Sequence, residues 1–483
     1  MSLRVPRRLI ATSLPVLVAT LALLSCREIP DGGTGVSWRS DQIHGFLDTL
    51  QHRTFLYFWE LGDTTRGLTP DRAPARSFVS TGAMGFALTA YPIGAEHRWV
   101  SRAAARERTL ATFRFLWSAP QDSSSNAAGY RGFYYHFLDP VTGRRFERVE
   151  LSTMDTALLL AGVLFCQSYF DRDDPAEAAL RALADSLVHR VDWRWAQPRP
   201  PVIALGWNPE SGHLPYDWRG YNEALLLHVL ALGSPTHAVG PETWDAWTSR
   251  YRWGTFEGQE QLGFAPLFGH QYSHAWIDFR GIHDSYMRAR GIDYFENSRR
   301  ATLSQRAYAV RNPGAWAGYG ARVWGLSACD GPKDTTLTLN GQRRSFRTYS
   351  ARGASFTGVE DDGTLTPTAA GGSITFAPEI AIPALLEMRA RWGDHLVGRY
   401  GFFDAFNPSL TEPMPVQHGR IVPGVGWFDT DYLGIDQGPI LIMIENLRSG
   451  LVWKHMKKNP NIVRGLRRAG FTGGWLDRAP ATP

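Results

Sequence analysis

The chain has 483 residues, of which 43% are hydrophobic and 20% charged, a composition that excludes an intrinsically disordered protein. Its formal net charge of +5 comes from 51 basic and 46 acidic residues, and the basic residues are scattered, which argues against a nucleic-acid-binding face. The 18 Trp, 17 Tyr and 25 Phe exceed what a core needs and favour a groove in which flat ligands such as sugar rings stack.

The N-terminus has the pattern of an export signal. Three arginines precede the apolar run 9–24, which is too short and wrongly flanked for a stable membrane span. The run ends in Leu-Leu-Ser-Cys, so Cys26 is predicted to be acylated as in bacterial lipoproteins; the alternative is an ordinary signal with a chance cysteine. We predict a signal peptide over 1–25 and a tether over 26–40. Because Arg27 is not the Asp of an inner-membrane retention signal, we expect an outer-membrane lipoprotein in the periplasm or at the cell surface.

The rest of the chain is predicted to be mainly helical. Apolar periodicity and capping residues predict helices over 42–61, 81–91, 98–117, 152–170, 175–191, 221–232, 241–252, 282–310, 378–392 and 440–453. Long connections rich in Gly, Pro, Trp, His and Asp separate them, at 118–150, 192–220, 254–281 and 312–377. Loops of this length are usually functional.

One of these connections contains a predicted β-hairpin. Residues 335–349 alternate in polarity, and Asn340-Gly341 favours a tight turn. Paired helices with elaborated loops at one end predict an all-α fold, an α/α toroid with minor β hairpins. We expect one catalytic domain over 41–465 and a C-terminal tail over 466–483.

Neither the cysteines nor the histidines form a convincing metal motif. Cys166 and Cys329 are expected to be separate core residues rather than a disulfide. His270 and His274 have the spacing of a metal pair, but Gln271 stands where a metalloprotease has its Glu. We therefore expect sugar-contacting or loop-holding histidines, with no metal and no cofactor.

Carboxylates beside aromatic residues give the strongest chemical signal, because glycoside hydrolysis needs one protonated and one ionised carboxyl group. Glu223 precedes an apolar stretch that would desolvate it and suit it as the acid. Asp155 lies in the first turn of another apolar helix, and Glu150 lies just before it. The structural alternatives are a capping acid at Asp155, a dipole-complementing acid at Glu223 and a solvated loop acid at Glu150. The predicted substrate-binding residues are Trp207, Tyr221, His270, Tyr272, His274, Trp276, Arg280, Trp324, Phe403, Asp404 and Asp436.

Segments in order over 67–453 resemble the bacterial glucoamylase-like family that includes the endo-β-1,2-glucanases of glycoside hydrolase family 144. They include G-L-T-P-D-R, F-Y-Y-H-F-L-D, S-T-M-D-T-A, G-Y-N-E-A, W-G-L-S-A-C-D-G-P, Y-G-F-F-D-A-F-N and G-I-D-Q-G-P. The resemblance implies an (α/α)6 toroid with a cleft at one end that hydrolyses a β-glucan, expected to be β-1,2-glucan, with inversion. It also implies an essential acid at Glu223. Asp155 stands where such members have Glu and Ser152 where they have Asp, so Glu150 is expected to supply the missing charge.

Two other function classes stay open at this point. A polysaccharide lyase on the same toroid would use Tyr, His and Arg on a uronate, and Arg219 and Arg280 are its cues. A non-catalytic glycan-binding lipoprotein would keep the aromatic platforms and need no paired acids. The expected partners are a glucan and, through the lipid on Cys26, the membrane. We expect a monomer that binds no nucleic acid.

Overall fold

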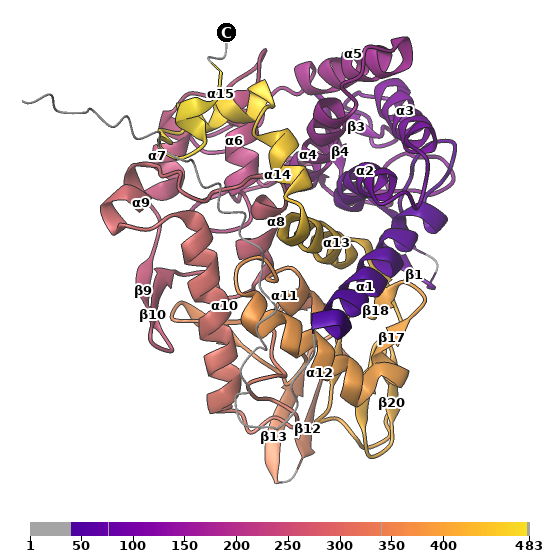
Figure 1. Ribbon diagram of the computed structural model, residues 1–483, viewed down its shortest axis with the longest axis vertical. Helices are drawn as coiled ribbons and strands as arrows, with labels where there is room; N and C mark the ends of the chain where they lie inside the picture. Colours follow the sequence, from indigo (N-terminus) through magenta and orange to yellow (C-terminus); the bar gives the residue numbers. More distant parts are fainter. Residues whose placement is uncertain (1–39, 76, 340, 481–483) are drawn as a thin grey trace, which may run out of the picture.

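Helices carry most of the fold, as the ribbon in Figure 1 shows. The computed structural model describes residues 40–75, 77–339 and 341–480. The predicted signal peptide, Cys26, nearly all of the tether and Asn340 of the predicted turn lie outside the described residues. No helix of the described part is both long and apolar enough to cross a membrane.

The centre of the fold is a ring of helices in mutual contact. In order around the ring these are α2 (Thr81–Glu96), α4 (Thr153–Tyr169), α6 (Leu225–Gly233), α8 (Phe268–Trp276) and α13 (Gly434–Arg448), which returns to α2; the short α11 (Pro367–Gly371) adjoins α13. Nearly all residues of α2, α4 and α6 are buried, since a helix that is apolar all round packs on all sides.

The segments that lead into several ring helices meet at one end of the ring. A side chain at Gly82, in the first turn of α2, would touch Asp155 of α4. Thr368 of α11 donates a hydrogen bond to the backbone carbonyl of Asp436 in α13 (3.1 Å). Residues that start these helices can therefore contribute to one shared site.

Further helices cover the ring from outside. They are α1 (Ser40–Leu61), α3 (Arg102–Ser118), α5 (Pro175–His189), α7 (Glu242–Thr248), α9 (Ser285–Arg290), α10 (Tyr294–Arg311), α12 (Pro378–Leu396), α14 (Leu451–Met456), α15 (Pro460–Arg468) and the 3-10 turn η1 (Leu476–Arg478). Among them α1 contacts α2 and α13, α10 contacts α8, α12 contacts α11, and α15 contacts α6. This arrangement confirms that the fold is mainly helical.

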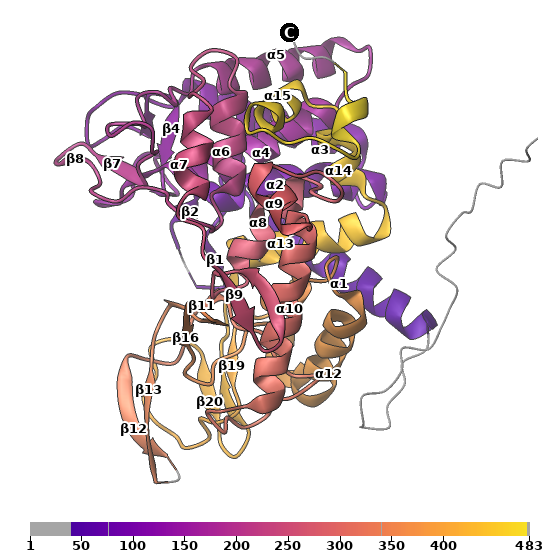
Figure 2. The same ribbon diagram turned by 90° about the vertical axis from the view of Figure 1, so that its left-hand side faces the viewer.

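The strands are short, and all their ladders are antiparallel. β1 (Arg72–Ala73) pairs with β22 (Tyr432–Leu433), β2 (Val79–Ser80) with β5 (Phe137–Leu138), β9 (Trp253–Phe256) with β10 (Gln259–Leu262), β11 (Ala328–Cys329) with β14 (Ser350–Ala351), β12 (Thr335–Leu339) with β13 (Gln342–Phe346), β15 (Gly353–Ser355) with β16 (Gly358–Glu360), and β17 (Val397–Gly398) with β18 (Gly401–Phe402). The larger sheets run in the order β3 (Gly129–Tyr130), β4 (Phe133–Tyr135), β6 (Leu151–Ser152), β7 (Gly206–Asn208), β8 (Gly212–His213), and in the order β19 (Phe406–Asn407), β21 (Gly426–Phe428), β20 (Arg420–Val422). In Figure 2 strands β7, β8, β11, β12, β13 and β16 gather on one side of the molecule.

Two of the predicted helices are each divided into two helices in the structure. The single helix expected over 282–310 is two helices, α9 and α10, because Gly291 has a left-handed φ of +71° and Asp293 caps the second one. The helix expected over 440–453 is α13 followed by α14, with Gly450 between them at a φ of +66°. In both cases the first helix ends at or just before a glycine, because a glycine readily adopts the left-handed backbone that terminates a helix.

Other predictions are confirmed or extended. The hairpin over 335–349 is present, with Leu339 opposite Gln342. Cys166 and Cys329 are separate buried thiols. The stretch 466–480, expected as a tail, buries Leu466, Phe471 and Leu476.

Candidate active site

Asp155 is held at the start of α4 by a reciprocal cap. Ser152 is the N-cap residue, and its Oγ accepts a hydrogen bond from the Asp155 N–H (3.1 Å) and donates one to Asp155 Oδ2 (2.6 Å). This cap satisfies an otherwise unpaired amide of the first turn. The second oxygen, Oδ1, is buried with no hydrogen-bond partner among the described residues. The predicted capping role is therefore real, and it leaves one carboxylate oxygen free.

His136 joins Asp155 to Glu150. Its Nδ1 lies 2.8 Å from Glu150 Oε1 and its Nε2 lies 3.5 Å from Asp155 Oδ2. Burial alone would lower the pKa of His136, but Asp155, Glu150 and the nearby Asp71 raise it to about 9. The same contact keeps the pKa of Glu150 low, although burial opposes this. Near neutral pH His136 is thus an imidazolium that lies between the side chains of Asp155 and Glu150, and the Glu150 side chain is one-third exposed.

Glu223 lies in the turn before α6, where the chain is fixed by another helix. Ser273 of α8 donates a hydrogen bond to the Glu223 carbonyl (3.0 Å) and accepts one from the Leu226 N–H (2.9 Å). The Glu223 Oε2 is shielded from solvent and has no partner among the described residues. Burial, with a smaller contribution from the Asp155 charge, raises the pKa of Glu223 to about 7. Glu223 can therefore carry a proton near neutral pH.

A second group of acids surrounds Arg72, the first residue of strand β1. The Arg72 guanidinium lies 2.6 Å from Asp330, 3.5 Å from Asp71 and 3.7 Å from Asp431. Burial raises the pKa of Asp71 to about 6 although Arg72 and His136 oppose the shift. Asp71 thus links this acidic group electrostatically to the His136 cluster.

Tyr272 lies between the two groups. Burial raises its pKa well above the usual range, and the charges of Asp436, Glu223 and Asp155 add to this. Its ring packs against Phe268 and Phe86. The structure therefore brings together the predicted residues Glu150, Asp155, Glu223, Tyr272 and Asp436.

Other predicted residues lie beside this group. Trp207 is partly exposed, and it pairs with Leu151, next to Glu150. Phe403 is partly exposed and packs on Tyr432 at 4.6 Å. Asp404 is buried beside Asp330, whose N–H donates a hydrogen bond to Asp404 Oδ2 (2.7 Å). Trp207 and Phe403 suit contact with a ligand at the edge of the site, whereas Asp404, at 2% exposure, is shielded from solvent.

Several substrate-binding predictions are corrected by burial. Trp276 and Trp324 are 0% exposed, and Trp276 donates to Thr89 inside the ring, so neither indole can reach a sugar. Tyr221 is buried in an aromatic cluster with Tyr294.

The same correction applies to the two histidines of α8. His270 and His274 are 1% exposed, and burial lowers the pKa of His270 to about 4 and that of His274 to about 3. They hold Phe264 and Ser298 in place. Arg280 is bound to Asp278 (2.7 Å) and lies over the Trp453 ring. The two histidines therefore have structural partners inside the fold, whereas Arg280 is half-exposed and stays a predicted substrate contact.

The sequence analysis missed several residues of the site, namely Asp71, Arg72, His136, Asp330, Asp429 and Asp431. They lie in loops or in strands of two or three residues, where periodicity gives no signal. Most of them stand in the segments that carry the family resemblance, such as G-L-T-P-D-R, F-Y-Y-H-F-L-D and A-C-D-G-P. Their position as polar residues inside these segments was the signal that could have identified them.

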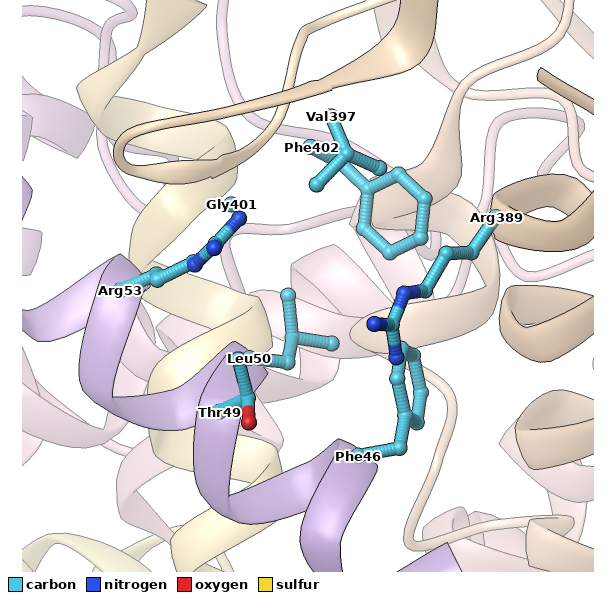
Figure 3. A pocket seen from close by; sticks show the side chains of 8 residues that line it. All are labelled: Phe46, Thr49, Leu50, Arg53, Arg389, Val397, Gly401 and Phe402. Carbon is cyan, nitrogen blue, oxygen red and sulfur yellow. The ribbon is translucent and has the colours of Figure 1, made fainter. Parts of the chain in front are cut away.

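Two surface hollows lie beside α1. Figure 3 shows one of them, in which Phe46, Leu50 and Phe402 form an apolar floor between Arg53 and Arg389. Arg389 lies over the Phe46 ring, and Arg53 donates to the Gly398 carbonyl. The neighbouring hollow is polar and is lined by Asp48, Thr49, His52, Arg53, His97 and Trp99. Neither hollow contains a predicted site residue.

Replacing Gly82 by Ala is expected to lower kcat by at least 10-fold while the fold is retained. The added methyl would lie 2.7 Å from Asp155 Oδ1 and 3.2 Å from Leu158 Cδ1, so the carboxylate must move. A displacement of about 1 Å in a catalytic group can cost about 100-fold in rate. Gly45→Ala is the control, since it lies on exposed α1 with open space around it. Equal kinetics for both variants would contradict the catalytic placement of Asp155.

The charge on His136 is expected to stabilise the folded protein in a pH-dependent way. Its folded-state pKa of about 9 exceeds its ordinary 6.5, so the stabilisation is complete below pH 6.5 and is lost as the pH rises through about 9. The difference in unfolding free energy between the wild type and His136→Asn should therefore shrink from pH 6 to pH 10. Urea unfolding at each pH measures it, with exposed His44→Asn as the control. A difference that does not change with pH would contradict the assignment.

Comparison with known proteins places this site in a family. The model of the glycoamylase family, described as "Putative glucoamylase", matches residues 215–460, half of the chain. A curated exo β-1,2-glucooligosaccharide sophorohydrolase of Parabacteroides distasonis is 27% identical over 456 residues, which cover 87% of this chain and 57% of that protein. The chain thus spans little more than half the length of this relative.

Solved structures agree with this placement over nearly the whole chain. A "putative glucoamylase" from Bacteroides uniformis ATCC 8492 has a TM-score of 0.76 at 32% identity and covers 91% of this chain and 99% of its own. The endo-β-1,2-glucanase of Chitinophaga pinensis, solved with sophorotriose and glucose, has a TM-score of 0.76 at 27% identity, with coverages of 90% and 99%. The resemblance stated from the sequence is confirmed, and the chain belongs to the glycoamylase family, among relatives that include β-1,2-glucanases.

Proposed function

We propose that this protein is a glycoside hydrolase that cleaves β-1,2-linked glucan. The observation that carries the proposal is Glu223, whose carboxyl group has a pKa of about 7 and whose shielded Oε2 has no hydrogen-bond partner among the described residues. A proton donor of this kind is what a glycosidic oxygen needs as the bond breaks. The β-1,2 linkage is proposed because the compared relatives of P. distasonis and C. pinensis act on β-1,2-glucans or their oligosaccharides.

The cluster of Asp155, His136 and Glu150 is proposed to position and activate the attacking water. His136 contacts both carboxyl groups, and its charge lowers the pKa of Glu150 and so favours the charged form of Glu150. The Glu150 side chain is partly exposed to solvent, whereas the Asp155 side chain is almost fully buried. The charge that the family places at the position of Ser152 is thus supplied by Glu150, through His136.

An inverting mechanism and an (α/α)6 toroid complete the proposal. Inversion requires a carboxyl pair about 6.5–9.5 Å apart, with room for water between them. The ring formed by α2, α4, α6, α8, α11 and α13 supports the inner layer of such a toroid. We propose one catalytic domain over 41–465.

A panel of linkage-defined glucans tests the activity. The purified protein should release reducing sugar from β-1,2-glucan, and not from β-1,3-, β-1,4- or α-1,4-glucan. The first product should have the α configuration by NMR, as expected when a β-linkage is cleaved with inversion. Absorbance of an unsaturated uronate from a polyuronate would instead indicate a lyase. Binding of β-1,2-glucan without any product would indicate a glycan-binding protein.

We also propose that the protein is a lipoprotein anchored through Cys26 to the outer membrane. The support is the Leu-Leu-Ser-Cys sequence at the end of an apolar run that follows three arginines. Cys26→Ser should move the protein from the membrane fraction to the soluble fraction of cells that produce it. An unchanged distribution would contradict acylation at this residue.

A further inference from the structure

Three buried carboxylates from distant parts of the chain face one another beside Arg72. Asp330 follows β11, Asp404 follows β18, and Asp429 follows β21. One oxygen of each lies within 4.8 Å of one oxygen of the other two. Their exposures are 0%, 2% and 0%. The contact depends on the fold, because the three residues are far apart in the sequence.

Each of these carboxylates is anchored through one oxygen and leaves the other free. Asp330 Oδ2 is bound by Arg72 (2.6 Å), and Asp404 Oδ2 accepts from the Asp330 N–H (2.7 Å). Asp429 Oδ1 accepts from the Thr430 N–H (2.7 Å). Asp330 Oδ1, Asp404 Oδ1 and Asp429 Oδ2 are buried and have no partner among the described residues. Buried polar atoms rarely stay unpaired. These three oxygens therefore require a positively charged partner that the described residues do not supply.

A fourth carboxylate strengthens this point. Asp436, in the first turn of α13, is 3% exposed, and its Oδ2 has no partner among the described residues. Its side chain lies within hydrogen-bonding reach of Asp404. Two carboxyl groups can face each other only with a proton or a cation between them. A single shared proton would serve this pair and leave Asp330 Oδ1 and Asp429 Oδ2 unpaired.

The protein's own cations near the group do not balance it. Arg72 is shared among Asp330, Asp71 and Asp431. His418 approaches Asp330 only at 3.9 Å. Arg352 is committed to Asp362 at 2.7 Å. Uncompensated buried charge is costly, and a divalent cation would offset it.

We infer that Asp330, Asp404 and Asp429 form a calcium-binding site, with Asp436 at its edge. Calcium prefers carboxylate oxygens at about 2.3–2.6 Å, so ligands on opposite sides of the ion are about 4.6–5.2 Å apart. Oxygens within 4.8 Å of one another therefore fit around one Ca²⁺. Magnesium usually keeps several water ligands, and carboxylates that are at most 2% exposed give water little access. The bound ion would tie together the loops that follow β11, β18 and β21.

Calcium binding is tested on the purified protein without substrate, so the result is independent of the proposed hydrolase activity. After treatment with EDTA and its removal, calorimetric titration should show one Ca²⁺ per chain with a Kd of about 1 mM or tighter, the range of extracellular calcium modules. The thermal midpoint should rise by roughly 2–5 °C in excess Ca²⁺. Absence of both effects in the wild type would overturn the inference, as would an equal thermal shift with Mg²⁺.

Asp429→Asn tests the residues, because it keeps the side-chain shape and removes one charge. It should weaken Ca²⁺ binding at least 10-fold and abolish the thermal shift. Asp361→Asn is the matched control, since Asp361 is also largely buried but both of its oxygens are bonded, by Tyr308 and Tyr319. Wild-type Ca²⁺ affinity in Asp429→Asn would overturn the inference. If this variant fails to fold, the titration of the wild type still decides.

Discussion

Replacing Glu223 by Gln is expected to lower kcat on β-1,2-glucan by about 10²–10⁴-fold, the usual contribution of general acid catalysis. The amide has nearly the same shape as the carboxyl group but cannot donate its proton to a leaving oxygen. The carbonyl of residue 223 should still accept the Ser273 hydrogen bond, so the fold should be kept. Steady-state kinetics and circular dichroism measure both effects.

The matched control for this variant is Glu260→Gln, which changes an exposed Glu on β10. It should have wild-type kinetics. If Glu223→Gln also turns over β-1,2-glucan at close to the wild-type rate, Glu223 is not the catalytic acid. Its charge would then only complement the dipole at the N-terminus of α6.

Asp155→Asn is expected to lower kcat by about 100-fold or more. The variant can keep the Ser152 cap but loses the charge that faces His136 and Glu223. If Asp155 served only as a first-turn acid, the change would cost at most ~1 kcal/mol of stability and leave kcat unchanged. Kinetics and urea unfolding of the same variant separate the two roles.

Asp174→Asn is the control for this second variant. Asp174 is the N-cap residue of α5 and accepts from the Ala176 N–H (2.9 Å), so it performs the helix-capping task without facing the site. Its replacement should leave kcat unchanged, since Asn is as good a cap as Asp. A similar loss of activity in both variants would point to general destabilisation.

The two principal acids could be predicted from the sequence because each precedes or begins an apolar helix. Asp155 begins α4 and Glu223 lies just before α6, so periodicity located both. The prediction could not include His136, which lies between β4 and β5, two short strands of different sheets with no periodic pattern. Its contact with Asp155 depends on the pairing of β4 with β6, which places Tyr134 opposite Ser152.

Helix α8 shows why other predictions were wrong. The stretch 254–281 was predicted to be a connection because Gly and aromatic residues break the helical pattern. In the structure Gly269 is needed beside the Phe264 ring. The polar residues of α8 are buried on tertiary partners, as when Gln271 donates to the Ala369 carbonyl. Burial of His270, His274 and Trp276 therefore could not be read from their chemistry, which is equally typical of a sugar-binding loop.

The sequence alone also could not predict the complete acidic group around Arg72. Asp404 and Asp436 were predicted individually as substrate contacts. Their proximity to Asp330 and Asp429 depends on three separate loops that meet only in the folded chain. The sequence spacing of these acids has no resemblance to a calcium loop, which draws its ligands from one short segment.

The pH dependence of kcat/KM on a β-1,2-gluco-oligosaccharide tests the central claim most directly. Glu223 must be protonated to act, and its pKa is about 7, so activity of the wild type should fall as the pH rises through about 7. In Glu223→Gln the residual activity should lack this falling limb. The same falling limb in both proteins would contradict the assignment of Glu223 as the proton donor.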